Sequence, residues 1–128
     1  MKKILYLLFV IFLVFSGCGE KHRKNLYTIG IFQVNDAPTL NTAVEGFLKA
    51  LQDNGLIQGK NITLIMKNAL GDISEVQNIA ENFVKSDIDL IAAFSTPCLQ
   101  AAINATQDIP TVFSSVANPY RAGAGTSP

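Results

Sequence analysis

The sequence predicts an α/β fold, a three-layer domain in which a parallel sheet carries helices on both faces. Four short patterns rich in apolar and β-branched residues alternate with three helical patterns between residues 27 and 114. Strands joined through helices form right-handed crossovers, which make the strands parallel and place the helices against the sheet. Leu90–Phe94 is continuously apolar, as expected of a strand buried on both faces.

The first strand is expected over Tyr27–Phe32, followed by the polar loop Gln33–Pro38. A helix should follow, because apolar residues then recur at the spacing of one helical face. These residues are Leu40, Ala43, Val44, Phe47, Leu48 and Leu51. Asn54-Gly55 should end this helix with a left-handed cap, and the second strand is expected over Asn61–Lys67.

The second helix should begin at Asp72, because Glu75 three residues later makes a pattern like a capping box. Its core face is expected to comprise Ile73, Val76, Ile79, Ala80, Phe83 and Val84. Ser86-Asp87 should end it before the third strand, Leu90–Phe94.

A third helix is expected from about Pro97 to Thr106, with Ser95 or Thr96 as its N-cap. Its inward residues should be Leu99, Ala102 and Ile103. The fourth strand, Thr111–Phe113, again runs into hydroxyl residues.

The first residues are typical of a secretory leader. A basic start, an apolar run from Ile4 to Phe15 and Ser16-Gly17-Cys18 predict a signal peptide over residues 1–17. The last three residues resemble a bacterial lipobox, so we expect lipidation at Cys18, with ordinary signal-peptide cleavage near the same place as the alternative. Residues 18–26 then form the lipidated cysteine and a polar tether.

Composition and motifs argue against several kinds of chemistry. Without Lys2 and Lys3 of the leader the chain has 8 basic and 10 acidic residues, which gives no electrostatic footprint for nucleic acid. The only histidine, His22, lies in the tether, and no cluster has metal-ligand spacing. A Gly-x-Gly-x-x-Gly fingerprint is absent. Cys98 is expected to be a small, half-buried residue rather than a nucleophile. We therefore expect no enzyme activity, metal or cofactor.

Ligands of parallel sheets bind beyond the carboxyl ends of the strands. The segments expected there are Gln33–Asp36, Asn68–Asp72, Ser95–Pro97 and Ser114–Asn118. They are rich in amides and hydroxyls, and their only charged residues are Asp36 and Asp72. A strand that runs straight into a helix also presents free N–H groups and the positive end of the helix dipole, which favour an anion. The hydroxyls of Ser95 and Thr96 have an alternative role, since each can simply cap the helix.

Five segments carry a common resemblance: Gln33–Phe47, Gly59–Ile62, Asn68–Asp72, Ser95–Pro97 and Ser115–Pro119. Together they resemble one family, the ABC-transporter substrate-binding lipoproteins whose characterised members take up aromatic amino acids. The resemblance implies a type I periplasmic-binding-protein lobe with flavodoxin-like strand order over residues 27–128. It also implies ABC permease partners and a lipid anchor on the extracytoplasmic face of the membrane.

In that family the ligand lies between two lobes, with its carboxylate at helix N-termini and hydroxyl groups. The resemblance therefore points to seven ligand-binding residues, Gln33, Asp36, Ser95, Thr96, Ser114, Ser115 and Asn118. The chain accounts for one lobe, so the sequence is interpreted as an N-terminal fragment whose second lobe is missing. Two alternatives stay open: a receptor for a sugar-like or nucleoside-like solute, and an anchored α/β enzyme with its catalytic groups in the missing half.

Overall fold

The computed structural model describes residues 26–126. The predicted signal peptide (residues 1–17), Cys18 and the tether before residue 26 lie outside the described residues. The elements follow one another as β1 (Tyr27–Gln33), α2 (Pro38–Asp53), β2 (Ile62–Asn68), α3 (Ile73–Lys85), β3 (Leu90–Phe94), α4 (Thr96–Ala105) and β4 (Thr111–Ser114). Within residues 26–126, no helix is long and apolar enough to cross a membrane.

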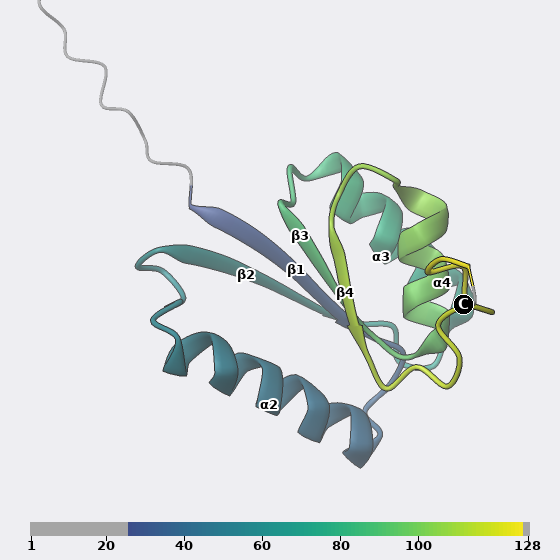
Figure 1. The fold of residues 1–128 in the computed structure, drawn as a ribbon, viewed down its shortest axis with the longest axis horizontal. Helices are drawn as coiled ribbons and strands as arrows, with labels where there is room; N and C mark the ends of the chain where they lie inside the picture. The colour runs from purple at the N-terminus through teal and green to yellow at the C-terminus, as the bar shows by residue number, and fades with distance from the viewer. Residues whose placement is uncertain (1–25, 127–128) are drawn as a thin grey trace, which may run out of the picture.

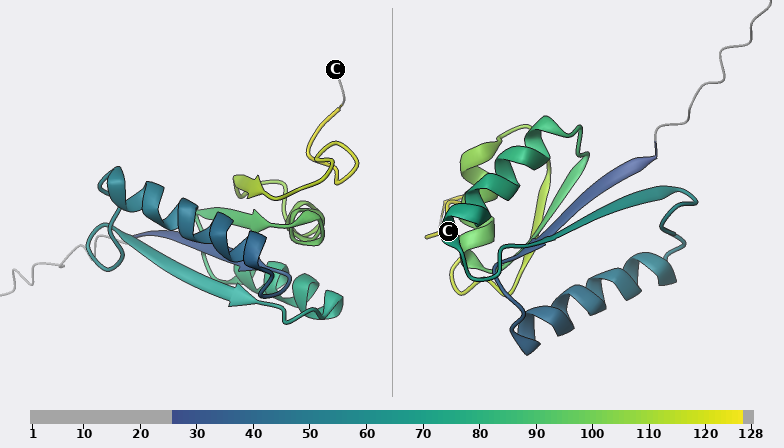
Figure 2. Two further views of the ribbon diagram at one scale, coloured as in Figure 1. Left: turned by 90° about the horizontal axis from the view of Figure 1, so that it is seen from below. Right: turned by 180° about the vertical axis from the view of Figure 1, so that it is seen from behind.

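The four strands form one parallel sheet in the order β2-β1-β3-β4 (Figure 1). This is the flavodoxin-like order expected from the sequence. Helix α2 lies on one face of the sheet, and α3 and α4 lie side by side on the other (Figures 1 and 2). The structure thus confirms the three-layer α/β fold.

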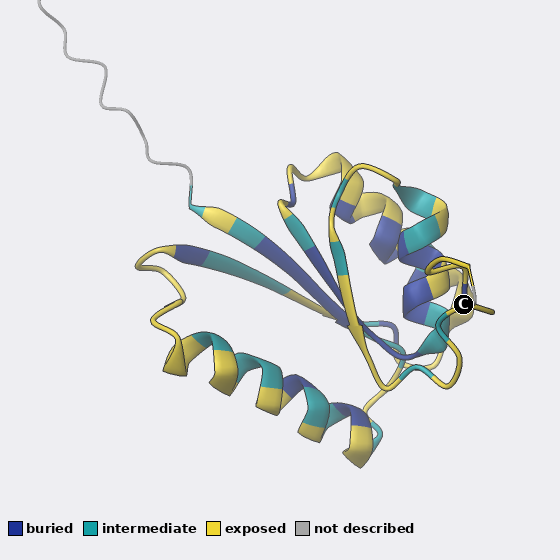
Figure 3. Ribbon diagram, viewed as in Figure 1, coloured by how far each residue is buried: buried dark blue, intermediate teal, exposed yellow. Residues whose placement is uncertain are grey.

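Each face of the sheet has its own apolar core, because alternate strand residues point to opposite faces. Ile29 and Ile31 of β1 pack beneath α2, whereas Phe32 packs beneath α3 and α4. The rings of Phe32 and Phe83 meet edge to face, with their centroids 5.5 Å apart. Figure 3 shows the inner strands largely buried and the outer face of α2 exposed. The carboxyl ends of β1 and β3 are therefore held by core on both sides.

Three expectations about burial are wrong. Ile73 and Val84 were placed on the core face of α3, yet they are 61% and 38% exposed. At 100° per residue they lie about 60° and 80° around the helix from Val76, at one side of the buried stripe. Cys98 was expected to be half-buried but is completely buried, because α4 packs it into the core.

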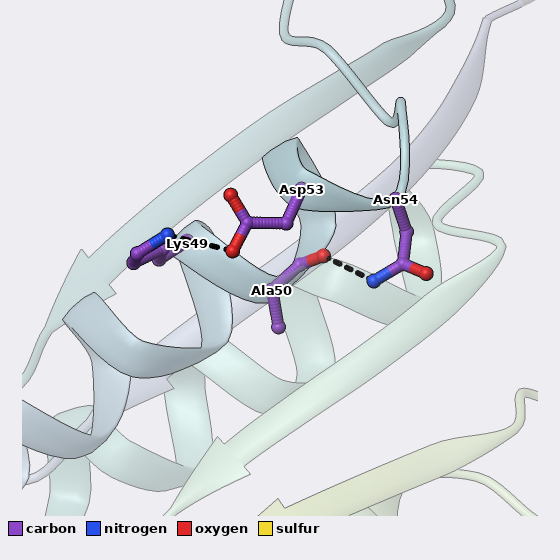
Figure 4. A network of polar contacts seen from close by, with 4 residues as sticks. All are labelled: Lys49, Ala50, Asp53 and Asn54. Carbon is purple, nitrogen blue, oxygen red and sulfur yellow. Dashed lines mark hydrogen bonds and ion pairs between the residues drawn. The ribbon is translucent and has the colours of Figure 1, made fainter.

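The end of α2 follows the sequence pattern closely. Gly55 has a φ of 79° and donates its N–H to the carbonyl of Gln52, which confirms the left-handed cap. The Asn54 side chain donates to the carbonyl of Ala50 at 2.8 Å, and Lys49 pairs with Asp53 at 2.6 Å (Figure 4). The Lys49–Asp53 pair is exposed on both sides, so it adds little stability.

Candidate functional site

The strands end in one row across the sheet. The register aligns Asn68 of β2 with Gln33 of β1, Gln33 with Phe94 of β3, and Phe94 with Ser114 of β4. The residues that follow these strands therefore meet at one edge, where Figure 1 shows the arrowheads converging. All seven residues expected to bind the ligand lie at this edge or in the loops that begin there. They form two groups.

The first group, the β1–β2 group, comprises Gln33, Asp36, Asn41 and Asn68. Gln33 Nε2 donates to Asn41 Oδ1 at 2.8 Å, and Asn68 Nδ2 donates to Asp36 Oδ1 at 2.7 Å. The Asp36 side chain is exposed, and its Oδ2 atom accepts no hydrogen bond within residues 26–126. This group therefore presents a fixed, negatively charged acceptor.

The second group, the β3–β4 group, comprises Ser95, Thr96, the last residue of β4 (Ser114) and the loop residues 115–118. Thr96 Oγ1 accepts the N–H of Ala117 at 3.2 Å, which ties the start of α4 to this loop. The same hydroxyl keeps its own proton to donate. The main-chain N–H groups of Thr96, Ser115 and Val116 have no partner within the described part of the chain. Hydrogen-bond donors thus collect at the positive end of the α4 dipole.

Three further residues of the β3–β4 group are open to solvent. Ser114, Ser115 and Asn118 are exposed, and Asn118 Oδ1 accepts the N–H of Arg121 at 3.0 Å. The Asn118 side-chain amide is therefore oriented and can donate through Nδ2. From residue 90 to residue 120 the only charged side chain is Asp108, which lies before β4 at the opposite edge. An anion at this group meets no carboxylate nearby in the sequence.

Ser95 adopts an unusual backbone conformation between β3 and α4. Its φ of 129° and ψ of 162° lie in a region that residues other than glycine rarely enter. The residue is 6% exposed, its Oγ accepts the N–H of Cys98, and its own N–H donates to the carbonyl of Ser114. Its hydroxyl oxygen is therefore committed to the cap. Ser95 is buried, whereas Thr96 is partly exposed and its hydroxyl bonds the loop after β4.

We predict that Ser95→Gly raises the free energy of unfolding by about 1 kcal/mol. Glycine removes backbone strain of about 1–3 kcal/mol, whereas as an N-cap it costs only a few tenths more than serine. Ser95→Ala keeps the strain and loses the cap, so it should cost about 1 kcal/mol. Urea unfolding of both variants tests this, and equal losses for the two would show that the conformation of Ser95 stores no strain.

Two members of the site are not among the seven residues expected from the sequence. Asn41 lies inside the first turns of α2 and carries no local signal, because only the packing of α2 on the sheet brings it to Gln33. Asn68 does carry a signal, since it follows the second strand directly, but it was not singled out. The main-chain N–H of Ala117 also contributes, and no sequence pattern identifies a backbone donor.

A hollow of about 350 Å³ opens beside the β1–β2 group, between α2 and β2. Apolar and polar side chains both line it: Ile31, Gln33, Asp36, Asn41, Val44, Glu45, Leu48, Met66, Lys67 and Asn68. Residues 26–126 contain no group of three or more metal-ligating side chains. Burial raises the pKa of the Cys98 thiol to about 11, which keeps it protonated near neutral pH. The groups described at this edge can interact with a ligand through hydrogen bonds and through charge.

Comparison with known proteins places this geometry in a family. Residues 28–125 match the family model described as ABC transporter substrate binding protein. The chain is 46% identical over 104 residues to a protein from Clostridioides difficile named "Tyrosine-binding protein", covering 81% of this chain and 29% of the relative.

Two solved structures are also similar. A ligand-free, open substrate-binding protein with adhesive properties from Clostridium difficile is 44% identical, with a TM-score of 0.75, over 77% of this chain and 33% of that one. An ABC domain in complex with L-Trp from Streptococcus pneumoniae is 25% identical, with a TM-score of 0.70, over the same shares of the two chains. The chain thus spans about a third of the length of these relatives.

Proposed function

The chain belongs to the family of ABC transporter substrate-binding proteins, and from this premise we propose that it binds an amino acid at the carboxyl edge of its sheet. The observation that carries the proposal is the separation of charge along that edge. Neutral donors and the start of α4 occupy the β3–β4 group, and the Asp36 carboxylate occupies the β1–β2 group. A zwitterion has the complementary arrangement.

The carboxylate of the ligand is proposed to lie against Thr96 and the loop after β4. Four donors are available to the carboxylate: the N–H groups of Thr96, Ser115 and Val116, which have no partner within the described residues, and the hydroxyl of Thr96. Ser114, Ser115 and Asn118 surround this position and can add side-chain donors. Hydrogen bonds to a charged group are stronger than those between neutral groups, so these donors can hold the carboxylate tightly.

The ammonium group is proposed to lie toward Asp36. The Asp36 side chain is held by Asn68, and Gln33 is held by Asn41, so neither must be ordered when the ligand arrives. Preorganised partners lose less conformational entropy on binding. The relative named for tyrosine and the pneumococcal structure with bound L-Trp support an aromatic amino acid as the ligand.

In the whole receptor, the described domain is proposed to be the N-terminal lobe, and a second lobe closes the cleft. The length of the relatives supports this, since they are about three times as long as the part this chain matches. The receptor is proposed to deliver its ligand to ABC permease subunits of an importer. Lipidation at Cys18 would hold it on the extracytoplasmic face of the membrane.

The proposal is tested by titrating the isotopically labelled chain with ligands and following its backbone amide chemical shifts. L-Tyrosine, L-tryptophan and L-phenylalanine are compared with glucose and adenosine, which represent sugar-like and nucleoside-like solutes. Shifts should concentrate at Thr96, Val116 and Ala117 and saturate with the amino acids. No response to any amino acid, or saturation by glucose or adenosine alone, would overturn the proposal.

A further inference from the structure

Leu70, in the loop between β2 and α3, lies at the carboxyl edge of the sheet. A leucine at this position does nothing to stabilise the fold. It is 78% exposed, more than any other large apolar side chain within residues 26–126. Its φ of 52° is in the left-handed region, where a leucine is strained by its Cβ. An exposed loop position with this backbone favours glycine or asparagine. Leucine here neither buries apolar surface nor adopts an unstrained backbone conformation.

The loop that carries Leu70 is rigidly attached to the site. Leu70 N–H donates to Asn68 Oδ1 at 2.8 Å, and Gly71 N–H donates to the carbonyl of Val34 at 2.7 Å. Ala69 N–H donates to the carbonyl of Gln33 at 3.0 Å, and the Ala69 side chain is buried in the core. The apolar side chain of Leu70 is therefore held in solvent by a fixed backbone, beside the β1–β2 group.

Leu70 lies where the side chain of the proposed amino-acid ligand would extend. Leu70 comes two residues after β2, and Thr96 comes two residues after β3. Strand β1 lies between them, so the two positions are separated by two strand spacings, or about 10 Å. Ile73, three residues along, is also 61% exposed and extends the apolar surface.

Resting on the proposed function, we infer that Leu70 is a specificity-determining residue that contacts the apolar side chain of the bound amino acid. The carboxylate is held at Thr96, the ammonium group faces Asp36, and the side chain extends along the edge to Leu70. A ring or a branched aliphatic side chain removes Leu70 from water, whereas a small polar side chain does not reach it. Leu70 thereby selects large apolar amino acids.

The test is Leu70→Asn, because asparagine removes the apolar contact and adopts the left-handed conformation more readily than leucine. We expect affinity for L-tryptophan to fall about tenfold, as the lost apolar area predicts. Affinity for L-serine should stay within about twofold, and the unfolding midpoint should stay unchanged or rise. Leu70→Met keeps an apolar side chain and should retain affinity within about threefold.

Leu56→Asn is the matched control, because Leu56 is 39% exposed and lies before β2, at the opposite edge of the sheet. It should bind L-tryptophan like the unmodified chain. If Leu70→Asn binds L-tryptophan with unchanged affinity while the unmodified chain binds it at Thr96, the role of Leu70 is refuted and the proposed function stands. If the unmodified chain binds no amino acid, the proposed function fails and this inference fails with it.

Discussion

Gly30→Ala is expected to lower the free energy of unfolding by about 1–3 kcal/mol, the usual cost of overpacking a core. Gly30 lies in the middle of β1, and an added Cβ would lie 2.9 Å from two ring carbons of Phe83. The Phe83 ring is 2% exposed and packs edge to face on Phe32, so it can make room only by giving up this contact. The cost should appear in urea unfolding followed by far-UV circular dichroism.

Gly46→Ala is the control of opposite sign. Gly46 is exposed in the middle of α2, and nothing lies within 4 Å of an added Cβ. The same substitution should therefore stabilise the domain by about 0.5–1 kcal/mol. Combining Gly30→Ala with Phe83→Leu should recover part of the loss, because the smaller side chain vacates the ring position. A Gly30→Ala chain as stable as the unmodified one would contradict the close packing of α3 on β1.

Thr96→Ala is expected to weaken amino-acid binding by about tenfold to a hundredfold. A hydrogen bond to a charged group is worth about 1.5–3 kcal/mol, and each 1.4 kcal/mol is a factor of ten in affinity. The substitution removes the hydroxyl and the hydrogen bond that it accepts from the N–H of Ala117, but it leaves the Ser95 cap of α4 in place. Dissociation constants from amide chemical-shift titration measure the effect.

Thr96→Ser should retain most of the affinity, since it keeps the hydroxyl on the same backbone. Thr42→Ala is the matched control, because Thr42 is exposed on α2 and bonds only the carbonyl of Pro38. It should leave binding unchanged. Binding by Thr96→Ala that equals the unmodified chain would place the carboxylate of the ligand elsewhere.

The fold was predictable because its signals are local. Short apolar strands, capped amphipathic helices and Gly55 each specify their element, and the alternation of elements specifies the parallel sheet. The errors concern position within an element. Ile73 and Val84 are apolar and near the right helical spacing, but the width of the stripe that a sheet covers depends on how α3 lies across it. That angle is a tertiary property.

The sequence predicts where the site lies, but not the role of each residue in it. Parallel strands bring their carboxyl ends to one edge, so the hydroxyls after β3 and β4 had to lie near Gln33. Which hydroxyl faces the edge depends on backbone dihedral angles, and the sequence does not reveal that Ser95 has a φ of 129°. Asn41 reaches Gln33 only after α2 has packed. The sequence therefore could not tell that Ser95 caps α4 while the hydroxyl of Thr96 is left for the proposed ligand.

The proposed function requires the β3–β4 group to hold the carboxylate of an amino acid. This is tested by titrating the chain with L-tyrosine and with tyramine, which has the same ring and ammonium group but no carboxylate. L-Tyrosine should shift the amides of Thr96, Val116 and Ala117 and saturate, while tyramine leaves them in place at the same concentrations. Equal shifts and equal affinity for the two compounds would contradict the claim.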